Sequence, residues 1–136
     1  MSAERERRRV RRVRVVIAED ADDFRLLLRK RLELDGRFVV VGEASNGQEA
    51  VDVTFEHGPD VVVMDLGMPV MDGYEAMRRI QERLPDAKVV VLSGTGANEG
   101  ANEAFEAGAF SYLEKGTAMD RILTALAPLA PPEFEE

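Results

Sequence analysis

Carboxylate, hydroxyl and lysine side chains follow the apolar segments of this sequence, and their types suit phosphoryl chemistry. They are Glu19 and Asp20 after residues 13–18, Asp65 after 61–64, Ser93 after 88–92 and Lys115 after 110–113. Three carboxylates in one pocket repel one another, so protons or a cation must offset their charge. Oxygen ligands without histidine or cysteine suit a hard divalent ion, and a few carboxylates with water suit Mg²⁺. A metal, a lysine and a hydroxyl around one carboxylate could support phosphoryl transfer to that carboxylate.

These side chains meet only if the apolar segments are parallel strands of one sheet. The run Val61–Met64 lies between Gly58-Pro59 and Gly67, and its length and β-branching favour a strand buried on both faces. Such a strand belongs inside a parallel sheet covered by helices. Asp65 then stands at the carboxyl end of the strand, where open α/β sheets bind their ligands.

The whole chain is predicted to contain five strand-then-helix units. The predicted strands are 13–18, 38–41, 61–64, 88–92 and 110–113, and the predicted helices are 21–34, 46–55, 72–84, 97–107 and 117–127. The predicted N-terminal caps are Ser45 or Asn46, Asp72 and Thr117, and the predicted inner face of the first helix is Phe24, Leu27, Leu28 and Leu32. We therefore expect an α/β fold: a five-stranded, doubly wound parallel sheet in the flavodoxin-like order 2-1-3-4-5, with helices on both faces.

Length and composition indicate one domain. We expect a basic arm at residues 1–12, the folded domain at 13–127 and a tail or linker stump at 128–136. The sequence has no cysteine, which excludes disulfides, thiolate metal sites and cysteine nucleophiles. It also has no signal-peptide pattern and no apolar run of membrane-spanning length, so we expect a soluble, cytoplasmic protein.

Charge is distributed unevenly along the chain. Residues 1–14 carry seven arginines against Glu4 and Glu6, a net charge of +5, whereas the remainder carries a net charge of −13. The field of the acidic body repels phosphates, so direct binding of nucleic acid by this chain is not expected. The arm itself is interpreted as a solvated tail.

Four short motifs follow one another in a specific order and spacing. They are Glu19-Asp20, Met64-Asp65-Leu66-Gly67-Met68-Pro69 with Met71-Asp72-Gly73, Leu92-Ser93-Gly94, and Tyr112-Leu113-Glu114-Lys115. Over about residues 13–127 the chain resembles the response-regulator receiver domain (CheY-like), the phosphoacceptor module of bacterial two-component systems. Residues 41–47 and the Lys115-Gly116 pair resemble the branch whose members usually carry a helix-turn-helix output domain.

The resemblance implies a metal-dependent phosphoacceptor site. Asp65 would be phosphorylated by a partner in a reaction that requires Mg²⁺. Asp20, Asp65 and the backbone carbonyl of Gly67 would bind the metal directly, and Glu19 would act through water.

The resemblance also implies how the phosphoryl group would be sensed. Lys115 would pair with the phosphoryl oxygens, Ser93 would hydrogen-bond to them, and Tyr112 would follow Ser93 inward as a switch aromatic. The population of two packings of the face built from the fourth helix, the fifth strand and the fifth helix would then shift.

Two glycines depart from the usual family pattern. Gly116 stands where the family usually has a proline in a cis bond, so analogy does not fix the geometry at Lys115. Gly67 stands where many relatives carry a polar side chain that helps to position the hydrolytic water. We therefore expect slow self-dephosphorylation, and a signalling switch rather than a turnover enzyme.

The implied partners are proteins. A histidine kinase or a histidine phosphotransfer protein would supply the phosphoryl group. A downstream protein target, or an output domain absent from this sequence, would receive the signal, and a phosphorylation-dependent homodimer is a further implied state. Neither a membrane nor nucleic acid is an expected direct partner.

Two other functions compete with the phosphoacceptor interpretation. A pseudo-receiver would bind partners without being phosphorylated. An aspartate-nucleophile phosphatase, similar to haloacid-dehalogenase-like hydrolases, needs a second acid two residues after the nucleophile, where this chain has Gly67. A nucleotide-binding flavodoxin-like domain needs a glycine-rich phosphate loop after the first strand, and this sequence has none.

Overall fold

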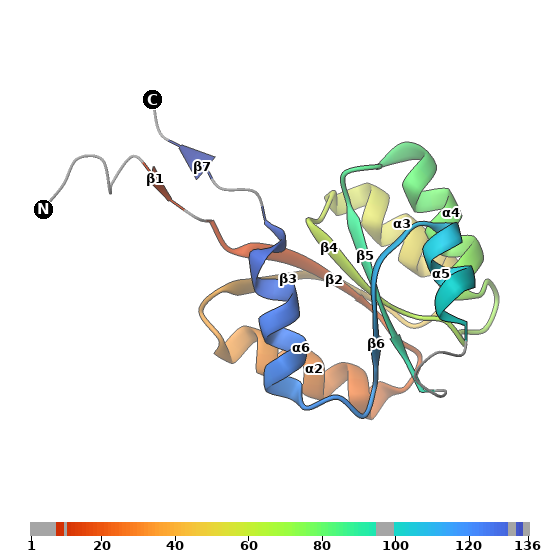
Figure 1. The fold of residues 1–136 in the computed structure, drawn as a ribbon, viewed down its shortest axis with the longest axis horizontal. Helices are drawn as coiled ribbons and strands as arrows, with labels where there is room; N and C mark the ends of the chain where they lie inside the picture. Colours follow the sequence, from red (N-terminus) through yellow and green to blue (C-terminus); the bar gives the residue numbers. More distant parts are fainter. Residues whose placement is uncertain (1–7, 10, 95–99, 131–132, 135–136) are drawn as a thin grey trace, which may run out of the picture.

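The central sheet of the protein has five parallel strands. A computed structural model describes residues 8–9, 11–94, 100–130 and 133–134. The strands are β2 (Val13–Ala18), β3 (Phe38–Ala44), β4 (Val61–Asp65), β5 (Lys88–Ser93) and β6 (Ala109–Glu114). They lie in the order β3-β2-β4-β5-β6 (Figure 1), which confirms the predicted order 2-1-3-4-5.

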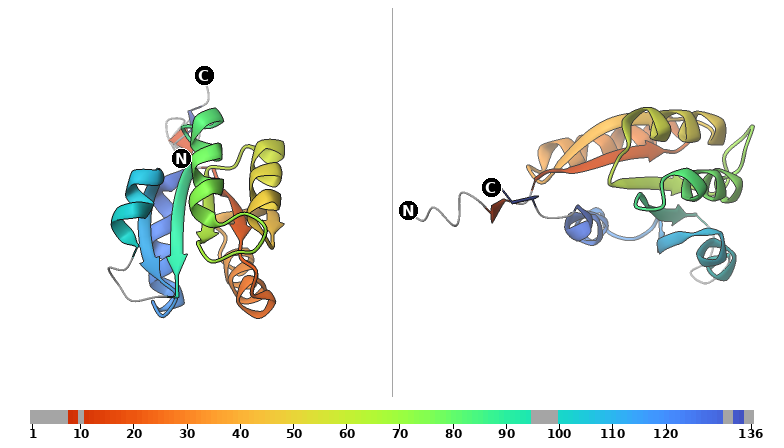
Figure 2. Two further views of the ribbon diagram at one scale, coloured as in Figure 1. Left: turned by 90° about the vertical axis from the view of Figure 1, so that its right-hand side faces the viewer. Right: turned by 90° about the horizontal axis from the view of Figure 1, so that it is seen from above.

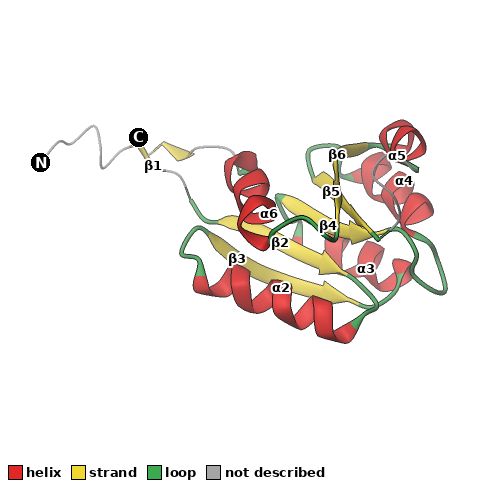
Figure 3. Ribbon diagram, turned by 60° about the horizontal axis from the view of Figure 1, so that its bottom comes forward, coloured by secondary structure: helices red, strands yellow, loops and turns green. Residues whose placement is uncertain are grey.

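Five helices cover the two faces of this sheet (Figure 2). They are α2 (Asp22–Leu34), α3 (Gly47–His57), α4 (Gly73–Arg83), α5 (Ala101–Ala107) and α6 (Met119–Leu126). Buried residues of α2 and α6 belong to one hydrophobic cluster, and those of α3, α4 and α5 belong to the other. Figure 3 shows α2 lying alongside β3 and β2. The predicted doubly wound arrangement is therefore confirmed.

Strand β4 lies at the centre of the core. All five of its residues are buried, and its side chains alternate between the two clusters, with Val61 and Val63 in one and Val62 and Met64 in the other. This burial explains why the strand is a continuous apolar run rather than an alternating one.

Capping explains where two of the helices begin. The side chain of Asn46 accepts a hydrogen bond from the backbone N–H of Glu49, and that of Asp72 accepts one from Glu75. The prediction that Thr117 caps the last helix is wrong. Ala118 occupies that position without a side-chain bond, because Thr117 still belongs to the turn in which its N–H binds the carbonyl of Glu114.

Two further predictions about helices need correction. Leu27, placed on the inner face of α2 with Leu28, is 51% exposed, because the face that packs on the core is the narrower stripe of Phe24, Leu28 and Leu32. Helix α5 begins at Ala101 after Gly100, whose φ of +84° suits glycine. The predicted start at Ala97 lies outside the described residues.

Two short described segments near the ends of the chain pair with each other, which the sequence did not predict. Strand β1 (Arg8–Arg9) pairs antiparallel with β7 (Glu133–Phe134), away from the central sheet (Figure 1), and the 3₁₀ turn η1 (Ala127–Leu129) follows α6. The prediction that the arm is a solvated tail is wrong at Arg11, which forms an ion pair with Asp60 at 2.6 Å. Across the described ranges, the longest helix has 13 residues and none has the length and apolarity to cross a bilayer.

Candidate functional site at the carboxyl edge of the sheet

Asp65 lies at the carboxyl end of the most buried strand. It is the last residue of β4 and is 8% exposed. Hydrogen bonding in register with β2 and β5 brings the ends of those strands to the same edge, with Ala18 opposite Met64 and Leu92 opposite Asp65. Glu19 and Asp20, which follow β2, and Ser93, the last residue of β5, are therefore the neighbours of Asp65 at this edge.

Glu19 and Asp20 join Asp65 in an acidic cluster. Glu19 is 3% exposed and Asp20 is exposed. One carboxylate oxygen from each of the three residues lies within 4.8 Å of the other two. The sequence prediction that these three carboxylates converge is borne out by this geometry.

Lys115 contacts two members of the acidic cluster. Its ammonium group lies 2.7 Å from a carboxylate oxygen of Glu19 and 3.7 Å from one of Asp65. Its backbone N–H donates to the carbonyl of Ser93 at 2.9 Å, which fixes the loop after β6 beside the end of β5. Lys115 thus supplies the positive charge inside the cluster, and it lies closer to Glu19 than to Asp65.

The surroundings of Asp65 raise its pKa to about 6, well above the value of a free aspartate. Burial is the largest cause, because it disfavours the charged form, and the negative charge of Glu19 adds to it. The positive charge of Lys115 and a long hydrogen bond from the N–H of Gly67, 3.4 Å away, act in the opposite direction. Near neutral pH Asp65 is therefore mostly ionised, in a site that carries excess negative charge.

A cavity of about 470 Å³ opens beside Asp65. Its lining residues come from the ends of β4 and β5, the loops that follow these strands, and helices α4 and α5: Asp65, Leu66, Gly67, Tyr74, Ser93, Gly94, Gly100 and Glu103. Ser93 is 4% exposed, so its hydroxyl belongs to the interior of this edge rather than to the outer surface. A larger cavity of about 690 Å³ lies at the opposite edge of the sheet, and none of the predicted site residues lines it.

Tyr112 does not lie in the acidic cluster. It is half-buried on β6, and its hydroxyl lies 3.8 Å from where a β-carbon of Gly100 would stand. The hydroxyl of Tyr74 donates to the carbonyl of Gly100 at 3.3 Å. Both tyrosines therefore reach the start of α5.

The two glycines that depart from the family pattern occupy open positions. Among the residues that the structure describes, chain neighbours apart, none has an atom within 4 Å of where a β-carbon of Gly67 or Gly116 would stand. No peptide bond in the described ranges is cis, so the bond from Lys115 to Gly116 is trans.

Sequence reasoning missed two residues that contact the site. Phe24 was assigned to the core, yet its ring also lies beneath the ammonium of Lys115, 5.2 Å away. Arg25 was not singled out, yet its guanidinium donates to the backbone carbonyl of Glu19 at 2.7 Å. Their places in the first turn of α2, directly after the acidic pair, were the only available signal.

Comparison with known proteins places this arrangement in context. The family model for the response regulator receiver domain matches residues 15–127. The chemotaxis protein CheY of Bacillus subtilis is 37% identical over 113 residues, which cover 83% of this chain and 93% of that protein. The signal receiver domain of the response regulator NarL from Mycobacterium tuberculosis superposes with a TM-score of 0.80 at 33% identity, covering 85% of this chain and 93% of that domain.

A third protein of similar structure carries a phosphorylated residue. It is a response regulator from Burkholderia pseudomallei with a phosphorylated aspartic acid, a calcium ion and citrate. The TM-score is 0.75 at 27% identity, and the match covers 84% of this chain and 66% of that one. In that protein, a receiver-like fold therefore occurs together with a phosphorylated aspartate and a divalent cation.

Proposed function

This chain belongs to the response regulator receiver domain family, and on that premise we propose that it is a signalling domain phosphorylated on Asp65. The observation that carries the proposal is the convergence of Asp65 with Glu19 and Asp20, with the ammonium of Lys115 3.7 Å from Asp65. Asp65 thus lies beside two carboxylates that can bind a cation with it, and beside an ammonium group that can offset added negative charge.

In the proposed reaction, Asp65 is the nucleophile. Its carboxylate oxygen attacks the phosphorus of a phosphohistidine on a histidine kinase or phosphotransfer protein. A P–O bond forms and the P–N bond breaks, its electron pair stays on the imidazole nitrogen, and that nitrogen takes a proton from water. With a pKa of about 6, Asp65 is mostly in the required ionised form near neutral pH.

The donor set fits a hard divalent cation. Glu19, Asp20 and Asp65 offer only oxygen ligands, and the exposed backbone at Gly67 leaves its carbonyl available as a further oxygen ligand. We propose that Asp20, Asp65 and the Gly67 carbonyl hold Mg²⁺ directly and that Glu19 acts through water. When bound, Mg²⁺ supplies positive charge that offsets the carboxylates and the incoming phosphoryl oxygens.

Lys115 and Ser93 are proposed to respond to the phosphoryl group. That group adds nearly two negative charges and three strong acceptors. Lys115 can turn from Glu19 toward the new oxygens, and the Ser93 hydroxyl can donate to them from the wall of the same cavity. Tyr112, next to the start of α5, would carry the change to the face formed by α5, β6 and α6.

The proposal extends to partners and lifetime. A cytoplasmic histidine kinase or phosphotransfer protein would act on residues 13–127, and a protein target or an attached output domain would read the α5–β6–α6 face, with a homodimer as one form of reader. We propose slow loss of the phosphate, because Gly67 has no side chain to position a hydrolytic water.

Intact mass after incubation with Mg²⁺ and acetyl phosphate tests the proposal. The protein without any substitution, called the unmodified protein from here on, should gain one phosphate, and Asp65→Asn should gain none. Asp86→Asn, at an exposed position away from the site, is the matched control and should behave like the unmodified protein. A protein that gains no phosphate would indicate a pseudo-receiver, and equal labelling of Asp65→Asn would refute Asp65 as the acceptor.

A further inference from the structure

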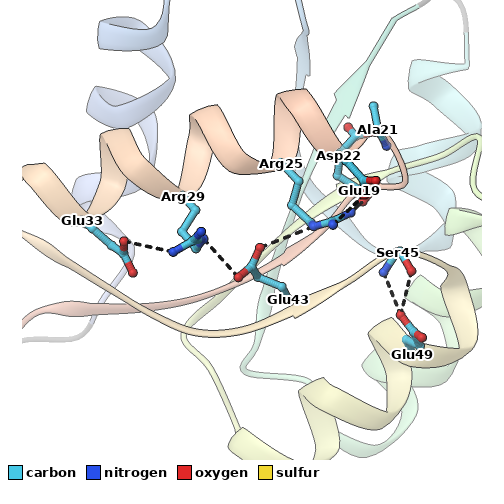
Figure 4. Close-up of polar contacts among 9 residues, drawn as sticks. All are labelled: Glu19, Ala21, Asp22, Arg25, Arg29, Glu33, Glu43, Ser45 and Glu49. Atoms are coloured by element: carbon cyan, nitrogen blue, oxygen red, sulfur yellow. Dashed lines mark hydrogen bonds and ion pairs between the residues drawn. The ribbon is translucent and has the colours of Figure 1, made fainter.

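The backbone of the acidic pair is held from two sides. The N–H of Glu19 donates to the carbonyl of Ala44 on β3 at 2.9 Å. The carbonyl of Glu19 accepts from Arg25, whose side chain reaches back from the first turn of α2 at 2.7 Å (Figure 4). The loop that carries Glu19 and Asp20 is therefore fixed by β3 and by the following helix.

The contact with the Glu19 carbonyl also orients Asp20. A peptide group is planar, so the carbonyl of Glu19 and the N–H of Asp20 lie in one plane. Fixing that plane restricts the direction in which the Asp20 side chain leaves the backbone. Asp20 is the exposed member of the acidic cluster and has the least packing to hold it in place.

Glu43 in turn orients Arg25. The Nε of Arg25 lies 3.4 Å from one carboxylate oxygen of Glu43, and the Nε of Arg29 lies 3.2 Å from the other (Figure 4). Arg25 also donates to Asp22 at 2.7 Å. The guanidinium of Arg25 is thus held by two hydrogen-bond acceptors and by an ion pair with Glu43, and its side chain is only 20% exposed.

We propose that Arg25 is a positioning residue for the phosphoacceptor site and that Glu43 sets its orientation. Arg25 touches neither Asp65 nor an incoming phosphoryl group in the contacts described. It acts by presenting Glu19 and Asp20 in the geometry that a divalent cation requires. This inference rests on the proposed function, because it assumes that the acidic cluster binds Mg²⁺.

Positioning and simple electrostatics predict opposite effects when Arg25 is replaced. Arg25 is a cation beside a cation site, so its field alone weakens the binding of Mg²⁺, and its removal would tighten that binding. If Arg25 acts by holding the Glu19 carbonyl, its removal must weaken binding. The sign of the change therefore separates the two explanations.

Arg25→Met, compared with Arg29→Met, provides the test. Both variants remove one guanidinium that contacts Glu43, but only Arg25 contacts the backbone of Glu19. Titration calorimetry with Mg²⁺ alone should give a dissociation constant about tenfold higher for Arg25→Met, as is common for groups that orient metal ligands. Arg29→Met should stay within about twofold of the unmodified protein, and Arg25→Lys should recover part of the loss because one donor remains.

The outcomes discriminate clearly. Tighter binding by Arg25→Met, or an equal loss in Arg25→Met and Arg29→Met, would overturn the positioning role while leaving the proposed function intact. Unmodified protein that does not bind Mg²⁺ would refute the proposed function, and this inference with it. Thermal unfolding in EDTA checks that each variant folds. If Arg25→Met does not fold, Glu43→Gln provides the test instead. An unchanged dissociation constant for Mg²⁺ in Glu43→Gln would contradict the inference.

Discussion

An aspartate lies at each end of β4, and the two carboxylates have different neighbours. Asp60, just before the strand, accepts two hydrogen bonds from Arg11 at 2.6 and 2.8 Å and one from the N–H of Arg14 at 2.9 Å. Asp65, at the other end, has Glu19 and Asp20 as neighbours and Lys115 at 3.7 Å.

This difference indicates that the aspartate at the amino end of β4 contributes to stability and the one at the carboxyl end to function. At the amino end, an arginine that binds through both of its terminal nitrogens offsets the charge of Asp60 and ties the arm to the sheet. At the carboxyl end, three carboxylates lie beside the one ammonium of Lys115, and burial together with the charge of Glu19 raises the pKa of Asp65. A group left in that condition is suited to take up a cation and a phosphoryl group.

Lys115→Met should give the largest effect. Loss of its ammonium should slow phosphate uptake from acetyl phosphate by about 100-fold, as for other preorganised groups that stabilise developing negative charge. The rate is measured by intact mass against time. Arg11→Met removes the cation paired with Asp60 at the other end of β4 and should leave the rate unchanged. Equal slowing in both variants would contradict the assignment of phosphate uptake to the carboxyl end alone.

Asp60→Ala should destabilise the fold by about 2 kcal/mol, because it removes hydrogen bonds in which Arg11 and the carboxylate are charged. Urea unfolding at pH 7 measures this change. Phosphate uptake by the folded variant should be normal. A variant as stable as the unmodified protein would mean that the amino end contributes nothing to stability.

Asp65→Asn should stabilise the fold by about 1 kcal/mol in EDTA at pH 7, which is less than the full shift in pKa implies because solvent screens charges at this edge of the sheet. The folded pKa of Asp65 is raised to about 6, so the folded state binds the proton more tightly than the unfolded state. The stability of the unmodified protein should therefore fall as pH rises from about 4 to 6, and this component should be absent in Asp65→Asn. Parallel pH profiles for the two proteins would contradict the raised pKa.

Phe24→Leu should have the smallest effect. The ring of Phe24 lies under the ammonium of Lys115, and such a contact contributes about 0.5–1 kcal/mol at a partly exposed site. We expect phosphate uptake to slow by roughly two- to fivefold, since Lys115 is then held less firmly. Phe24→Tyr keeps the aromatic face and should retain the normal rate, so equal slowing in both variants would exclude the ring contact as the cause.

The sequence predicted the carboxyl end of β4 better than the amino end. Parallel strands place their carboxyl ends along one edge, so the cluster of Glu19, Asp20 and Asp65 followed once the strands were recognised. The pairing of Arg11 with Asp60 spans 49 residues and involves no motif, so no local pattern could indicate it.

The remaining errors have similar physical causes. Thr117 has the side chain of a cap, but the turn after β6 places Ala118 at the start of α6. The pairing of β1 with β7 depends on the two chain ends leaving the domain side by side. The orientation of Arg25 depends on Glu43, which lies on β3. That strand follows both the acidic pair and α2 in the sequence, so no local pattern connects the two residues.

Locating the phosphate tests the central claim most directly. Fragmentation of the phosphorylated protein by mass spectrometry, with Mg²⁺ and acetyl phosphate as reagents, distinguishes the two ends of β4. If Asp65 is the phosphoacceptor, the phosphate lies on Asp65 both in the unmodified protein and in Asp60→Asn, and omission of the metal prevents labelling. Phosphate on any other residue, or labelling of Asp65 that is equally fast in EDTA, would contradict it.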